Sequence, residues 1–163
     1  MDSKKFNNLG NIVNFIGKIE LYASILTLIV MVLLIIYSVL LRYVFHKPAI
    51  WISATITLIF IWTSMLSISY VYKKRGHISI TFFIDRVLSF DKKIKKIVNI
   101  LIYLIIIVNL IFVILGTIQV IPLHAGRNII GLGISRVYLS AAILTSIVSM
   151  LITTIYFLIC EIN

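Results

Sequence analysis

The sequence predicts an all-α integral membrane protein with four transmembrane helices. Hydrophobic residues make up 61% of the 163 residues, charged residues only 12%, and the mean hydropathy is +1.15. Soluble domains average roughly 45–50% apolar and about 25% charged residues. Four long segments also lack any Asp, Glu, Lys, Arg or His. This composition excludes an ordinary soluble globule and a disordered tail, and the single cysteine, Cys160, excludes an internal disulfide.

The four charge-free segments are long enough to cross a bilayer, which takes about 20 apolar residues. They cover residues 21–41, 49–72, 97–123 and 137–160. The third span is the longest, so we expect it to tilt or bend, with a break at Pro122. The first run is longer than the apolar part of a signal peptide and ends at Arg42, so we interpret it as a retained span. The whole chain, 1–163, should form one four-span domain.

The distribution of basic residues predicts the orientation in the membrane. The net charge of +10 would suggest a nucleic-acid partner in a soluble protein, but basic residues also flank the cytoplasmic ends of membrane spans. Eleven Lys and Arg residues lie in the N-terminal arm and the loop between spans two and three, against four on the other side. The positive-inside rule therefore places both termini in the cytoplasm, with no role for nucleic acid. The short connection from Arg42 to Pro48 makes spans one and two antiparallel neighbours.

Two segments outside the spans have the pattern of amphipathic interfacial helices. In the N-terminal arm, 1–20, apolar residues recur at helical spacing between asparagines and Lys18. In the middle loop, 78–90, the apolar stripe consists of Ile80, Phe83, Ile84 and Val87. Such helices lie in the headgroup layer with the apolar face toward the acyl chains. The alternative for each is a short helix that packs on a neighbouring protein.

The sequences of the spans show no pattern typical of a catalytic, metal or cofactor site. They contain no Asp, Glu, Lys, Arg or His, and such residues in membrane spans usually mark ion pathways or substrate sites. The three histidines lie at span ends or in loops, so we expect no haem, no metal site, no cofactor and no catalytic residue. Polar residues such as Asn109 are expected to form hydrogen bonds between helices. Small residues at every fourth position of span four predict close helix packing: Ala141, Thr145, Ser149 and Thr153.

The stretch 42–88 resembles the small membrane subunit of tripartite ATP-independent periplasmic (TRAP) transporters. The residues that carry the resemblance are Arg42, Tyr43, Phe45, Trp51, Trp62, Arg75 and His77, followed by the interfacial segment. Gly131-Leu132-Gly133 before span four, four spans and cytoplasmic termini also match the family. Ser53 and Ala54 stand where the family usually carries one or two acidic residues.

The resemblance implies a scaffold rather than an enzyme. In this family a periplasmic binding protein captures an organic acid, such as a C4-dicarboxylate, sialic acid or another sugar acid. A large sodium-coupled subunit then moves it across the bacterial inner membrane. The implied partners are therefore the large subunit, the periplasmic protein and membrane lipid. Lys47 and Arg127 are candidates for docking the binding protein, and Arg42, Trp51, Trp62 and His77 for contacts with the large subunit or for structural roles.

Two other functions remain open from the residues alone. The chain could work as a self-contained homo-oligomeric transporter or channel, with a pore lined by the Ser/Thr face of span four. A lipid-modifying membrane enzyme would need acidic or histidine residues at the interface. The acidic residues available for it are scattered: Glu20, Asp85, Asp91 and Glu161.

Overall fold

The computed structural model describes residues 3–47, 50–75 and 92–162. Within them the chain forms four long helices, each apolar enough to cross a membrane. They are α1 (Ser3–Tyr43), α2 (Ile50–Arg75), α4 (Lys92–Ala125) and α5 (Val137–Ile162). The prediction of an all-α membrane fold with four long apolar helices is confirmed, and the described parts of the four predicted spans lie within these helices. The interfacial segment 78–90, with Ile80, Phe83, Ile84 and Val87, lies outside the described residues, as does His77.

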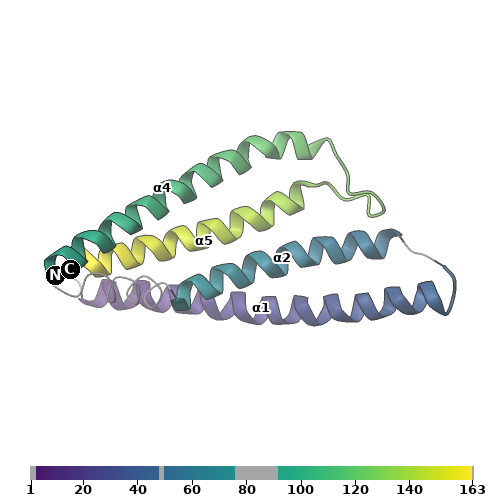
Figure 1. The fold of residues 1–163 in the computed structure, drawn as a ribbon, viewed down its shortest axis with the longest axis horizontal. Helices are drawn as coiled ribbons and strands as arrows, with labels where there is room; N and C mark the ends of the chain where they lie inside the picture. Colours follow the sequence, from purple (N-terminus) through teal and green to yellow (C-terminus); the bar gives the residue numbers. More distant parts are fainter. Residues whose placement is uncertain (1–2, 48–49, 76–91, 163) are drawn as a thin grey trace.

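The helices form two antiparallel hairpins that meet along α2 and α5 (Figure 1). α1 packs along α2, as the short connection predicts, and α4 packs along α5. The two hairpins converge at the end that carries both termini and spread apart at the other end (Figure 1). The termini therefore lie at one end of the bundle, and the α1–α2 turn and the α4–α5 loop lie at the opposite end.

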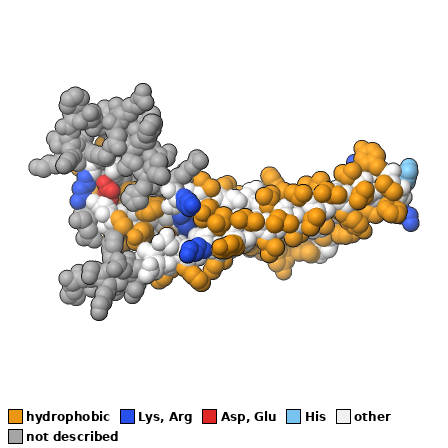
Figure 2. Space-filling model, turned by 90° about the horizontal axis from the view of Figure 1, so that it is seen from below, with side chains coloured by type: hydrophobic (Ala, Val, Ile, Leu, Met, Phe, Trp, Pro, Cys, Tyr) orange, Lys and Arg blue, Asp and Glu red, His pale blue; other side chains and the backbone are white. Residues whose placement is uncertain are grey.

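The interior of the bundle is polar and its surface is apolar. Ten buried side chains are polar or charged and seven are hydrophobic, among the described residues. Large exposed hydrophobic residues cover all four helices, and Figure 2 shows them as a continuous band between basic side chains at both ends. In a bilayer, apolar side chains gain little by leaving the lipid for the protein interior, whereas polar groups without hydrogen-bond partners are costly. Membrane helices therefore associate through small and polar residues.

Hydrogen bonds donated by hydroxyl groups join the helices in this way. Thr63 donates to the Thr27 hydroxyl at 2.8 Å, linking α2 to α1. Ser146 donates to the Met65 carbonyl at 2.7 Å, linking α5 to α2. The packing stripe of α5 is rotated from the predicted one, because Ala142 and Ser146 are buried with Ser149 and Thr153, whereas Thr145 is exposed.

Two helix boundaries differ from the expectations. The N-terminal arm is helical, but it continues the first span as one 41-residue helix instead of forming a separate surface helix. Val13, Gly17 and Glu20 are buried on one face of the arm, which packs within the bundle. Pro122 does not end its helix either, because α4 continues to Ala125. α4 does follow a curved path, as its length suggested (Figure 1).

Candidate functional site

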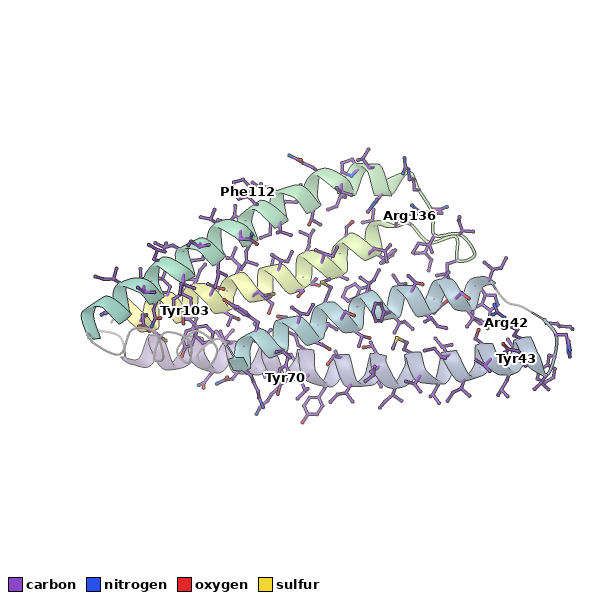
Figure 3. The ribbon with its side chains drawn as sticks, in the orientation of Figure 1. Arg42, Tyr43, Tyr70, Tyr103, Phe112 and Arg136 are labelled. Carbon is purple, nitrogen blue, oxygen red and sulfur yellow. The ribbon has the colours of Figure 1, made fainter. Side chains whose placement is uncertain are left out.

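The charged side chains that the structure describes at the end of the bundle opposite the termini are all basic. Arg42 lies in the last turn of α1, Lys47 in the following turn and Arg127 in the α4–α5 loop, and all three are exposed. Figure 3 shows Arg42 and Arg136 at this same end of the molecule. The two acidic side chains that the structure describes, Glu20 and Glu161, lie nearer the other end. This basic end can attract an acidic surface through long-range electrostatics.

The α4–α5 loop is a narrow hairpin. Ile129 donates its N–H to the Ile134 carbonyl at 2.8 Å, and Arg136 donates to the Arg127 carbonyl at 2.9 Å. His124 and Ser140 form a hydrogen bond of 2.8 Å that closes the base of the hairpin. The backbone of Arg127 is thereby held in a defined place at the basic end.

Gly131 places the tip of this hairpin against the start of α2. Its φ is +91°, and an added Cβ would lie 3.3 Å from the Ile50 carbonyl carbon and 3.3 Å from the Trp51 Cα. A side chain would therefore strain the backbone and push the hairpin off α2. Trp51, 47% exposed, lies beside this contact. The structure thus brings Arg127 and Trp51, which the sequence singled out separately, to the same end of the molecule.

A second surface runs along the outer side of α4. Ile105, Asn109, Phe112, Gly116 and Gln119 follow one another at intervals of three or four residues, and all are exposed. We call this stripe the amide face of α4. An added Cβ on Gly116 would meet nothing within 4 Å, and Phe112 is 69% exposed and points away from the bundle (Figure 3).

The expectation that Asn109 bonds to another helix of this chain is wrong for the described residues, because its side chain is exposed and no such bond forms. Two amide side chains and a glycine on the exposed face of a membrane helix are unusual. Small and polar residues at such spacing are typical of helix–helix interfaces in membranes. The amide face is therefore a candidate surface for a partner protein.

A third feature is a buried charged cluster that joins α1, α2 and α5. Lys73 Nζ lies 2.6 Å from Glu20 Oε2, and the two side chains are only 7% and 8% exposed. Ser69 donates to Glu20 Oε1 at 3.0 Å, and Ser149 donates to the same oxygen at 2.5 Å. Lys73 also donates to the Ser149 hydroxyl at 2.7 Å. Each charge is therefore matched by an opposite charge and by further hydrogen bonds, which is what burial of an ion pair requires.

Comparison with known proteins identifies the family. Residues 31–163 match the model of the DctQ component of tripartite ATP-independent periplasmic transporters. The chain belongs to this family. It is also similar to a Haemophilus influenzae protein named "Putative TRAP transporter small permease protein", with 26% identity over 138 residues. That match spans 85% of this chain and 82% of the relative.

For this DctQ-family chain the match confirms the resemblance seen in the sequence. The family is a transporter component rather than a family of enzymes. Four helices able to span a membrane fit a multi-pass membrane protein. The match includes the basic end, the amide face of α4 and three of the residues of the charged cluster, Ser69, Lys73 and Ser149.

The structure also shows where the other residues singled out from the sequence lie. Arg42 and Lys47 are exposed and lie with Arg127 at the basic end, whereas Trp62 is half-buried within α2. Glu161, which had no expected role, accepts a hydrogen bond of 2.9 Å from Asn99 and joins α4 to α5. Sequence reasoning placed Glu20 and Lys73 just outside the spans and so missed their pairing. A usable signal was present, because Ser69 and Lys73 are four residues apart on one helix face.

Proposed function

We propose that this chain is the small scaffold subunit of a TRAP transporter in the bacterial inner membrane. It supports a large sodium-coupled subunit in the import of an organic acid, such as a C4-dicarboxylate, sialic acid or another sugar acid. A periplasmic binding protein delivers the substrate. The observation that carries the proposal is the family match over residues 31–163.

The interior of the bundle supports a static role. In the part of the chain that the structure describes, the ion pair between Glu20 and Lys73 also has hydrogen bonds to serines of α2 and α5. These side chains therefore stabilise the packing of three helices. Five of the six Ser and Thr residues of α5 are buried, and only Thr145 is exposed. Ser146 bonds to Met65 of α2 and Ser149 to Glu20 of α1, so these hydroxyl groups face the interior of the bundle rather than an external pore. This arrangement disfavours a homo-oligomeric channel lined by α5.

The proposed orientation has both termini in the cytoplasm. The basic residues follow the positive-inside rule, with eleven in the N-terminal arm and the segment between spans two and three and four on the other side. The two termini lie at one end of the bundle, as this topology requires (Figure 1). In this orientation the basic end faces the periplasm, where the binding protein arrives.

We propose that Lys47 and Arg127 dock an acidic patch of the binding protein. Both are exposed, and no acidic residue that the structure describes lies beside them to neutralise their charge. Exposed complementary charges act mainly on the rate of association and are screened by salt. Arg42 ends α1 directly, and its proposed role is structural or in contact with the large subunit.

The amide face of α4 is the proposed contact with the large subunit. A helix of that subunit can supply hydrogen-bond partners for Asn109 and Gln119 and approach closely at Gly116. Hydrogen bonds between helices in membranes contribute roughly 0.6–2 kcal/mol each. The face is open in the isolated chain because α4 packs on α5 through its other side.

Uptake assays test the proposal. Reconstituted liposomes should take up substrate when this chain, the large subunit and the binding protein are all present. This chain alone should give none. Sodium-driven uptake by the chain in isolation would contradict the scaffold function.

Docking is tested by the double variant Lys47→Glu/Arg127→Glu, with Lys47→Arg/Arg127→Lys as a charge-preserving control. The reversal should raise the concentration of binding protein needed for half-maximal uptake, most strongly at low salt, and leave complex assembly intact. An unchanged concentration dependence would leave Lys47 and Arg127 without a docking role.

A further inference from the structure

A groove between α1 and α2 opens near the end of the bundle that carries the termini. Its volume is about 630 Å³, and its lining includes Asn11, Asn14, Lys18, Tyr22, Tyr70 and Lys74. Asn11, Asn14 and Lys18 lie on the arm that continues α1 beyond the charge-free span, which begins at Leu21. The groove thus lies where the hydrophobic core of the bilayer gives way to its headgroup layer.

The groove is positively charged. Lys18 and Lys74 are exposed, and neither forms an ion pair with another residue that the structure describes. Lys73 also lines the groove, and its ammonium bonds to Glu20. The negative charge of Glu20 is therefore neutralised by Lys73 and does not offset the charges of Lys18 and Lys74. The Lys74 ammonium lies 5.5 Å from the centre of the Tyr70 ring, a contact that holds it at the groove.

The polar part of the groove continues into an apolar track along α1. Lys18, Tyr22, Ile25 and Ile29 follow one another on one helix face. Tyr22 is 71% exposed, Ile25 44% and Ile29 52%. At 1.5 Å per residue the track from Lys18 to Ile29 is roughly 16 Å long, close to the depth of one leaflet. Figure 2, which views the α1 side, shows basic side chains at this edge of the hydrophobic band.

We propose that this groove is a binding site for an anionic phospholipid, which nothing in the DctQ family match assigns. The lipid phosphate lies between Lys18 and Lys74, with Asn11 and Asn14 donating to headgroup oxygens. The acyl chains lie along Tyr22, Ile25 and Ile29. Basic pockets between transmembrane helices on the cytoplasmic side are suited to anionic headgroups. The inference goes beyond the proposed function, because it depends on the groove and the membrane and not on the transported substrate.

The first test is lipid retention by the purified full chain, measured by native mass spectrometry after incubation with phosphatidylglycerol or phosphatidylcholine. The chain should retain phosphatidylglycerol in preference to phosphatidylcholine. The variant Lys18→Gln/Lys74→Gln should bind phosphatidylglycerol roughly 25-fold more weakly, since each lysine near an anionic surface contributes about fivefold. The control Lys47→Gln/Arg127→Gln removes two charges at the other end and should retain the lipid. No headgroup preference, or equal loss in both variants, would overturn the site.

A second arm distinguishes a lipid from a free anion. Inorganic phosphate added at the same phosphate concentration as the lipid should leave the bound phosphatidylglycerol in place, because it cannot occupy the apolar track. Displacement by inorganic phosphate would mean that the groove binds an anion rather than a phospholipid, and the proposal would be wrong.

The third arm asks what covers the groove in the assembled transporter. A photoreactive phenylalanine analogue replacing Tyr22 should form an adduct with the mass of a phospholipid when intact membranes are irradiated. A protein adduct at this position would show that a partner subunit occupies the groove, and would overturn the lipid site. Retention of the monomer elution volume by each variant confirms that the chain has folded.

Discussion

At the scale of single residues, the charged cluster decides how α1, α2 and α5 fit together. Glu20 accepts hydrogen bonds from Ser69, Ser149 and Lys73, which come from two other helices. Gly17 lies one turn away on α1, where an added Cβ would come within 3.3 Å of Lys73 Cδ. The absence of a side chain at this position allows α1 and α2 to approach closely enough for the ion pair to form.

Removing one member of the pair should destabilise the fold more than removing both. The variants Glu20→Met and Lys73→Met each leave an unpaired buried charge, which typically costs about 3–5 kcal/mol. The double variant Glu20→Met/Lys73→Met leaves neither charge, so its stability should lie above that of either single variant. Melting midpoints in detergent measure this. Additive losses in the double variant would contradict the pairing.

At the scale of elements, the hairpin between α4 and α5 depends on its glycines. Gly131 has φ +91° and touches the start of α2, whereas Gly126 has ordinary backbone geometry and open space around it. Gly131→Ala should therefore introduce roughly 1–3 kcal/mol of backbone strain, and Gly126→Ala should introduce none. We expect faster hydrogen exchange at the Arg136 N–H, which bonds to Arg127, in Gly131→Ala only. Equal exchange in both variants would show that the contact with α2 does not hold the hairpin.

A second prediction at the scale of elements concerns the amide face of α4. Gly116 and Ile111 are both exposed on α4, but Ile111 lies on a neighbouring side that is wholly apolar. Gly116→Phe should block close approach of a partner helix and reduce co-purification of the large subunit. Ile111→Phe adds a similar ring toward lipid and should leave co-purification unchanged. An equal loss of co-purification in both variants, or no loss in either, would show that the large subunit does not contact the amide face of α4.

How far the sequence predicted these elements follows from the physics of each signal. Hydropathy locates the spans well, because a bilayer requires a long apolar run in each of them. It cannot show whether the arm and the first span form one helix, because the amphipathic pattern of the arm is the same in both cases. Ser69 and Lys73 mark a polar face of α2, but the choice of Glu20 as their partner depends on how α1 and α2 are rotated against each other, and no local pattern contains that information. Asn109 illustrates the same limit, since its polarity predicts a partner but not on which protein the partner lies.

At the scale of the whole molecule, the two ends have different proposed tasks. The end with the termini holds the charged cluster and the lipid groove, where the hairpins converge (Figure 1). The opposite end carries Arg42, Lys47, Arg127 and Arg136, with no acidic side chain that the structure describes. The proposals for both ends depend on the same orientation, with the termini in the cytoplasm.

Cysteine labelling in intact cells tests this orientation. In a background with Cys160→Ala, single cysteines at Lys47 and Arg127 should react with a membrane-impermeant maleimide, because both positions are exposed at the end that the proposed orientation places in the periplasm. A cysteine at Lys74 should react only after the cells are permeabilised, since the proposed orientation places its end of the bundle in the cytoplasm. Permeabilised cells also provide the control that each cysteine is reactive. The opposite labelling pattern would show that the chain has the reverse orientation in the membrane. The basic end would then lie in the cytoplasm and could not dock a periplasmic protein.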